Sequence, residues 1–203
     1  ETHLTTEEEL AIAEHENPFA PWLKAKEKMQ KRQFGAAVPL LEEVLASDDP
    51  NASKFKEDAH YYLGVGQYEQ RRYVKAIQTL DAFLKARGVK NKHASDARYF
   101  QFKSAESLYA GSPNSNNDAL YIAKISDFTR DYPRHRFVYE AHFRLGEYFQ
   151  EKGEYLKAVK AYKKVRGAPA YQVRSDFATL QSYFEVLHAV EDGKPNVPLD
   201  EAE

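Results

Sequence analysis

The chain has 203 residues, and its 29 basic and 31 acidic residues give a formal net charge of -2, which provides no general attraction to nucleic acid or anionic membranes. It contains no cysteine, which excludes disulfides, thiolate zinc sites and a cysteine nucleophile. No uninterrupted apolar run approaches the length of a membrane span.

Residues 1–21 are predicted to form a short N-terminal helix followed by a linker. The run TTEEEL is typical of a capped helix start, and the two prolines of NPFAP at 17–21 end the helix. The sequence begins with Glu1 and shows no signal peptide. We interpret it as a processed or excised chain, which leaves room for a removed export signal or lipid anchor.

Hydrophobic periodicity predicts helix pairs over residues 22–190. Each pair contains two runs of apolar residues at helical spacing, separated by a short turn. The pairs are 22–32 with 34–47, 54–70 with 73–86, 94–109 with 119–129, and the two halves of 137–165. A single closing helix follows at 171–190, with apolar residues Phe177, Leu180, Tyr183, Phe184 and Leu187.

Two segments lack a periodic apolar face. Residues 111–117, GSPNSNN, are predicted to be a loop inserted between the two helices of the third pair. Residues 191–203 are predicted to be a disordered tail or linker.

Small and aromatic residues recur at one spacing in three of the four pairs. An aromatic residue follows a small residue after nine positions, and an alanine follows it after twelve. The sets are Gly64, Tyr73 and Ala76; Gly146, Tyr155 and Ala158; and, more weakly, Ala25, Phe34 and Ala37. Glycine inside a helix is about 1 kcal/mol less favourable than alanine, so Gly64 and Gly146 indicate a close approach of the paired helix.

This pattern resembles the tetratricopeptide repeat. The resemblance implies an all-α fold, a right-handed α-solenoid of about four antiparallel helix pairs over residues 22–190. The helix at 171–190 would cap the C-terminal end of the core. The implied function is a non-catalytic scaffold, without a cofactor, that binds a peptide or helix of a protein partner in a concave groove.

In that family the first helix of each pair lines the groove. The matching positions here are Tyr61, Tyr62, Val65 and Tyr68; Phe102, Glu106 and Tyr109; and Phe143, Arg144, Glu147 and Gln150. The basic clamp that the family uses for an acidic C-terminus is missing at Val65 and Glu147, so we expect aromatic and polar contacts. Tyr61 and Phe143 are predicted to be partly exposed on one concave surface that is the main partner site.

No catalytic or metal site is predicted. The seven histidines include no HExxH pattern and no two spaced four apart on one helix. His60 and His142 occupy equivalent positions in two pairs, which indicates packing of the repeat rather than metal ligation. There is no glycine-rich phosphate loop, and nothing places a Ser, a His and an Asp together.

Two alternative functions remain open. The segment 98–103, RYFQFK, interleaves aromatic and basic residues, as proteins that stack single-stranded bases do. A helical-repeat RNA-binding protein would require a basic concave face. The other alternative is a regulatory or helper module of a larger enzyme.

A narrower resemblance concerns the turn YPRH at 132–135 and the segment EAHFRLGEYFQEKGEYLKAVKAYKKV at 140–165. These segments are similar to bacterial envelope repeat proteins of the outer-membrane assembly lipoprotein family and the Tol-Pal coordinator family. The resemblance implies an exported bacterial protein in the periplasm or cell envelope. The lipidated N-terminal cysteine of the lipoprotein family has no counterpart in this sequence.

Overall fold

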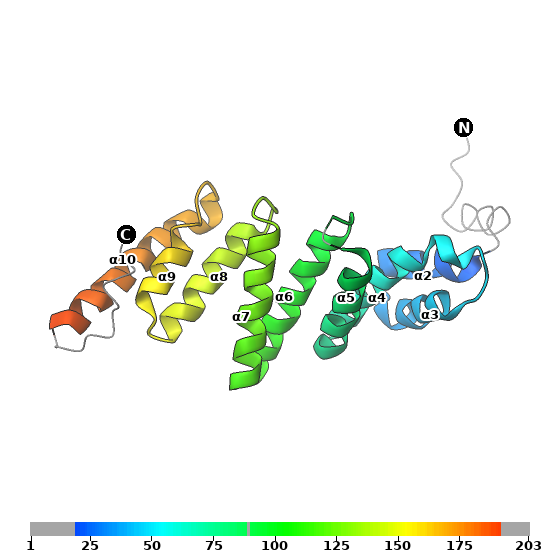
Figure 1. Cartoon of the computed structure of the whole chain (residues 1–203), viewed down its shortest axis with the longest axis horizontal. Helices are drawn as coiled ribbons and strands as arrows, with labels where there is room; N and C mark the ends of the chain where they lie inside the picture. The colour runs from blue at the N-terminus through cyan, green and yellow to red at the C-terminus, as the bar shows by residue number, and fades with distance from the viewer. Residues whose placement is uncertain (1–18, 89, 192–203) are drawn as a thin grey trace. The chain divides into compact units, whose positions relative to one another are not determined.

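The computed structural model describes residues 19–88 and 90–191, and this part of the chain is built from helices without any strand (Figure 1). The chain divides into two compact units, unit 1 at residues 1–124 and unit 2 at residues 125–203. The predicted all-α fold is confirmed. The helix and tail expected at the two ends lie largely outside the described residues, and the single domain over 22–190 stays a prediction.

The helix bounds confirm the predicted order of helix pairs. The helices are α2 (Ala20–Gln30), α3 (Phe34–Ala46), the 3-10 turn η1 (Ala52–Lys54), α4 (Lys56–Glu69), α5 (Tyr73–Arg87), α6 (Ala94–Gly111), α7 (Ser115–Asp131), α8 (Val138–Glu151), α9 (Tyr155–Tyr162) and α10 (Pro169–Glu191).

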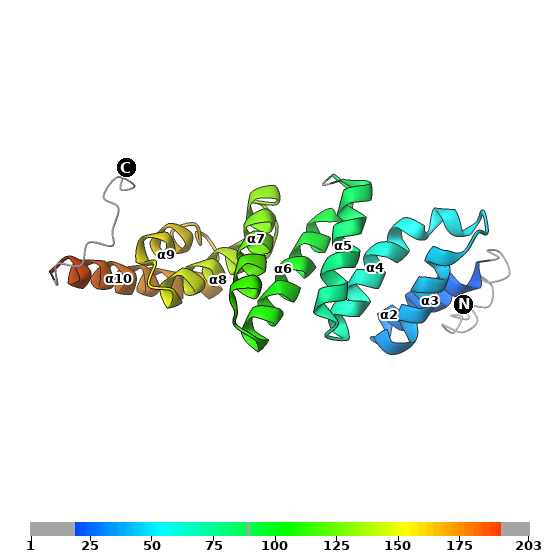
Figure 2. The same cartoon turned by 60° about the horizontal axis from the view of Figure 1, so that its bottom comes forward.

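In unit 1, each helix packs against the next helix along the chain from α2 to α6 (Figure 2). The first helices of successive pairs also touch, because α4 contacts both α2 and α6. These three helices therefore form a row, which is the part of unit 1 where the sequence predicts a binding surface.

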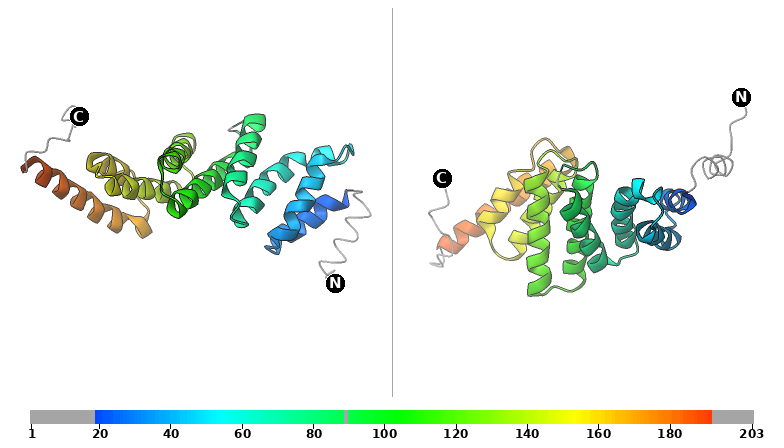
Figure 3. Two further views of the ribbon diagram at one scale, coloured as in Figure 1. Left: turned by 90° about the horizontal axis from the view of Figure 1, so that it is seen from below. Right: turned by 45° about the vertical axis from the view of Figure 1, so that its right-hand side comes forward.

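In unit 2, α8 pairs with α9, and α10 packs on both of them (Figure 3). The face of α10 that enters this packing carries small residues: Ser175 and Ser182 are fully buried, and Ala178 packs against the cluster around Phe143. Helix α10 thus covers the α8–α9 pair as predicted. The apolar residues expected to do so lie on its other face and are exposed.

The connection between α6 and α7 is shorter than predicted, because α7 begins at Ser115 and only residues 112–114 lie between the helices. Asn114 accounts for the difference. Its side-chain oxygen accepts hydrogen bonds from the backbone N–H groups of Asn116 and Asn117, at 3.1 and 3.0 Å. This bonding satisfies donors that the first turn of a helix leaves unpaired, so an asparagine-rich segment typical of a loop starts a helix instead.

Two glycines inside first helices make the close approach that the repeated spacing predicts. A Cβ atom on Gly64 would lie 2.5 Å from the side chain of Leu80, and one on Gly146 would lie 2.4 Å from the ring of Tyr162. In both pairs the large side chain comes sixteen residues after the glycine. The paired helix therefore fills the volume that a Cβ would take.

The equivalent histidines of α4 and α8 are packing residues. His60 and His142 are half-buried, and His60 lies edge-on to Phe83 with the ring centroids 6.1 Å apart. Burial lowers the pKa of both rings, with a smaller effect from Arg87 on His60 and from Lys164 on His142, whose pKa falls to about 4. Among the described residues, His142 Nδ1 has no hydrogen-bond partner.

We expect Gly146→Ala to destabilise the chain by about 1–3 kcal/mol, because the added methyl group overlaps the Tyr162 ring and the two helices must separate. The matched control is Gly35→Ala on α3, where a Cβ would meet nothing within 4 Å. There alanine should stabilise the helix by up to about 1 kcal/mol. Chemical denaturation of both variants measures the effect, and equal changes would contradict this account of Gly146.

The free energy of unfolding should decrease as the pH falls from about 6.5 toward 4, partly because His142 takes up a proton more readily in the unfolded chain. Because the folded-state pKa of about 4 lies below the ordinary value of 6.5, the unfolded chain binds a proton in this window that the folded chain does not. The contribution is fully present above about 6.5 and is lost as the pH falls toward 4. We therefore expect the melting temperature of His142→Gln to fall less than that of the wild type between neutral pH and the middle of this window.

The matched control for this measurement is His188→Gln, which changes an exposed histidine of the same unit. Its melting temperature should follow the wild type over the window. A His142→Gln variant that loses as much stability as the wild type would show that protonation of this ring does not couple to unfolding.

Candidate protein-binding surface

Three of the predicted groove residues are buried aromatic rings. Tyr61 is 7% exposed, Phe143 is 3% exposed, and Phe102 has no exposed surface. They share one place in the repeat, three residues before the small residue of the first helix. The prediction that Tyr61 and Phe143 are partly exposed is wrong.

The physical reason is a ring contact with the helix that starts the next pair. In unit 1, the Tyr61 ring stacks on His93, the residue that precedes α6, with the centroids 4.3 Å apart and an interplanar angle of 6°. In unit 2, the Phe143 ring contacts Tyr171 near the start of α10, at 5.5 Å. These rings join one helix pair to the next and are covered by it.

The remaining predicted residues of α8 are also engaged within unit 2. Arg144 Nη1 donates a hydrogen bond to Glu147 Oε2 at 2.9 Å, and Arg174 of α10 approaches the other oxygen of Glu147 at 3.5 Å. Gln150 Oε1 accepts a hydrogen bond from the Tyr162 hydroxyl at 2.8 Å, and burial raises the pKa of Tyr162. These side chains therefore serve the packing and ion pairing of α8, α9 and α10.

In unit 1, a set of half-buried side chains remains on α4. We call Tyr62, Val65 and Tyr68 the α4 row. The Tyr62 ring contacts Trp22 of α2 at 6.0 Å, and the Tyr68 ring contacts Phe100 of α6 at 5.2 Å. The row therefore lies where the first helices of three successive pairs meet. Within the described residues, neither tyrosine hydroxyl forms a hydrogen bond.

Helix α6 extends this surface with the predicted residues Glu106 and Tyr109. Both are half-buried. Glu106 forms an ion pair with Lys103, one turn earlier on the same helix. The Tyr109 ring stacks on Tyr121 of α7, with the centroids 5.4 Å apart and an interplanar angle of 2°. The sequence predicted both residues as positions on the binding surface. It did not predict the contacts with Lys103 and Tyr121, because these depend on where other side chains lie in space.

The charges beside the α4 row are paired with one another. Asp58 lies 2.7 Å from Lys92 and 2.9 Å from His93. Burial acts to raise the pKa of Asp58, but hydrogen bonds from Lys92 and His93 outweigh it and lower the pKa. At the other end of α4, Glu69 pairs with Arg32 at 3.5 Å. The α4 row therefore offers aromatic and apolar side chains for contact, and the charged side chains beside it are paired with opposite charges.

The described residues contain no arrangement that suggests metal chemistry. Within residues 19–88 and 90–191, no three His, Asp or Glu side chains gather as they would around a metal ion. An open hollow of about 330 Å³ in unit 2 is lined by Tyr162, Lys163, Arg166, Gln172, Asp176, Thr179 and Leu180. Most of these side chains are exposed, and the hollow holds no buried charged group.

No helix in the described part of the chain combines the length and the apolar character needed to cross a membrane.

Comparison with known proteins identifies a repeat in unit 1. A tetratricopeptide repeat family model matches residues 23–90, which include most of α2, all of α3 to α5 and the whole α4 row. No curated protein matches the chain. The solved structure described as "Crystal structure of MamA protein" is similar, with a TM-score of 0.57 and 16% sequence identity, covering 89% of this chain and 97% of that chain. The chain thus has a tetratricopeptide-like helical-repeat fold, with the family's sequence signature at residues 23–90.

Proposed function

We propose that this chain is a non-catalytic scaffold that binds a protein partner through the α4 row. The observation that carries the proposal is the half-buried set of Tyr62, Val65 and Tyr68 at the meeting of α2, α4 and α6. The matching tetratricopeptide segment supports it, since this type of repeat generally mediates binding between proteins.

The rings of the α4 row are already held in place. Tyr62 lies between Trp22 and His93, at 6.0 and 5.8 Å, and Tyr68 lies between Phe100 and Tyr73, at 5.2 and 5.8 Å. A ring that is fixed before binding loses little conformational freedom when a partner covers it. Tyrosine also combines a large apolar area with a hydroxyl that can bond to a partner's backbone.

The paired charges around the row favour a partner that brings apolar side chains and hydrogen-bond acceptors rather than a strongly charged segment. A peptide or a helix of another protein fits this description. We further propose a location in the bacterial periplasm or cell envelope. That proposal rests on the resemblance of residues 132–165 to envelope repeat proteins.

The RNA-binding alternative has weaker support. In the segment 98–103, Phe102 is fully buried, and Gln101 is fully buried and donates a hydrogen bond to Asp81 at 2.6 Å. Arg98 donates a hydrogen bond to Gln101 at 3.1 Å. The interleaved pattern therefore reflects the packing of α6 against α5. A role as helper module of an enzyme is tested by the activity of any larger protein that contains this sequence.

We expect Val65→Arg to reduce partner binding at least tenfold, because it places a charge in the centre of an apolar contact. The experiment is affinity capture from the source organism with the wild-type chain as bait. Each captured protein is then titrated against the wild type and the variant. The matched control is Val74→Arg on α5, since Val74 is 55% exposed and lies outside the row.

A second variant separates the hydroxyl groups from the rings. The double variant Tyr62→Phe with Tyr68→Phe keeps the packing and removes both hydroxyls. A loss of affinity smaller than that of Val65→Arg would indicate that the hydroxyls form hydrogen bonds with the partner. If Val65→Arg folds with unchanged helicity and retains every captured partner, the α4 row is not the site. Salt-dependent binding of an RNA oligomer in place of any protein would favour the alternative.

A further inference from the structure

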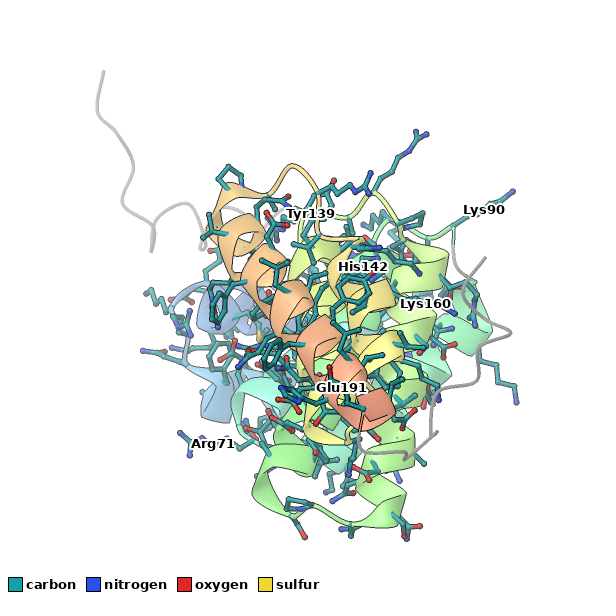
Figure 4. All side chains as sticks on the ribbon, turned by 90° about the vertical axis from the view of Figure 1, so that its left-hand side faces the viewer. Arg71, Lys90, Tyr139, His142, Lys160 and Glu191 are labelled. Carbon is teal, nitrogen blue, oxygen red and sulfur yellow. The ribbon has the colours of Figure 1, made fainter. Side chains whose placement is uncertain are left out.

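Helix α10 carries a continuous stripe of exposed apolar side chains. We call Val173, Phe177, Leu180, Phe184 and Leu187 the α10 stripe, and each of these residues is between 60 and 77% exposed. Figure 4 looks onto this helix, which crosses the face of unit 2 turned toward the viewer and ends at Glu191. Contiguous exposed apolar surface of this kind marks an interaction site or a liability for aggregation.

The stripe has the spacing of a helix–helix seam. Its residues follow one another after four, three, four and three positions. This alternation is the a/d pattern of a heptad, which keeps one apolar edge facing a partner helix along its length. The opposite face of α10 is already used, because Ser175, Ala178 and Ser182 pack it against unit 2. The stripe is therefore a second face of an anchored helix, and it is exposed among the described residues.

We propose that the α10 stripe binds the α10 stripe of a second copy of this chain, with the two helices antiparallel. Outside α10, the large apolar side chains exposed in the described residues are Val74 on α5 and Tyr139 on α8, which stand singly. The α4 row is half-buried among neighbouring rings, so the α10 stripe is the exposed apolar row that the described part of a second copy presents. Contact between two stripes uses the same patch on both copies, which produces a closed two-fold dimer.

The size of the stripe fits this role. A fully exposed aromatic ring presents about 200 Å² and an aliphatic side chain somewhat less, so the exposed stripe offers on the order of 600 Å². Two copies together would bury at most roughly 1,200 Å², which is the lower end of the range for specific interfaces. A dimer of micromolar rather than picomolar affinity is the expected result.

The side chains of the stripe favour the antiparallel arrangement. Phenylalanine occupies one set of heptad positions, at Phe177 and Phe184, and Leu180 and Leu187 occupy the other. A parallel pair would place Phe against Phe and Leu against Leu. An antiparallel pair places Phe177 against Leu187 and Leu180 against Phe184, and this alternation of larger and smaller residues packs more evenly. It also opposes the two helix dipoles.

The first test is the mass of the chain in solution. The chain of 23.3 kDa should sediment as a dimer at tens of micromolar, and Leu180→Asp should raise the dimer dissociation constant at least tenfold. Leu180 is 69% exposed, so this variant should fold, as its helicity and melting temperature will show. Val74→Asp is the matched control and should dimerise as the wild type does. A wild-type chain that stays monomeric at high concentration overturns the proposal, and so does a Leu180→Asp variant that dimerises fully.

The second test gives the orientation of the helices. Because the chain has no cysteine, Glu191→Cys and Glu185→Cys each provide a single site for a spin label. In the antiparallel pair the two labels at position 191 lie about 27 Å apart along the helix axes, at about 1.5 Å per residue, and those at position 185 about 9 Å apart. A parallel pair would give short distances at both positions and overturn the antiparallel arrangement.

Discussion

The fold depends on a steric constraint between the paired helices, which is seen in α4 with α5 and in α8 with α9. A glycine in the first helix leaves space where a side chain would be. A large side chain from the second helix, sixteen residues later in the sequence, fills that space. The pairs are Gly64 with Leu80 and Gly146 with Tyr162. Glycine within a helix is about 1 kcal/mol less favourable than alanine, and the filled contact offsets this. The contact therefore sets how closely these paired helices approach each other.

A second contact repeats with the same regularity and connects one pair to the next. Trp22 stacks on Phe55 at 5.4 Å, and the Tyr61–His93 stack repeats the contact one pair later. In each case the second ring belongs to the residue just before the next first helix. The aromatic residue at this position of the repeat, Trp22 or Tyr61, is therefore buried in the core. In the proposed function, its neighbours on the same helix contact the partner.

This division explains what the sequence could and could not predict. The periodicity gave the helix pairs, because each helix has a dominant apolar side and the small residues recur at one spacing. It could not decide between Tyr61 and Tyr62, which differ by about 100° around α4. Tyr61 is covered by Phe83 of α5 and by His93, which is 32 residues away in the sequence. Such contacts appear only when side chains are placed in space.

Helix α10 shows the same difficulty in a stronger form. Both of its faces have residues at intervals of three and four, and pattern reasoning assigns the more apolar face to the core. The structure uses the face with Ser175 and Ser182 instead. Small residues permit a close approach to α9. The Ser182 hydroxyl donates a hydrogen bond to the Ala178 carbonyl at 2.8 Å, whereas among the described residues the buried Ser175 hydroxyl has no hydrogen-bond partner.

In the proposed dimer, one face of α10 serves folding and the other serves association. The inward face holds the helix on unit 2 without using its larger apolar residues, which remain available for another chain. A dimer formed in this way carries two copies of the α4 row. A partner with two binding segments could then engage both rows, and the second contact would be effectively intramolecular. Weak binding at each row would then become strong binding overall, which fits the proposed scaffold because each row consists of only a few half-buried side chains.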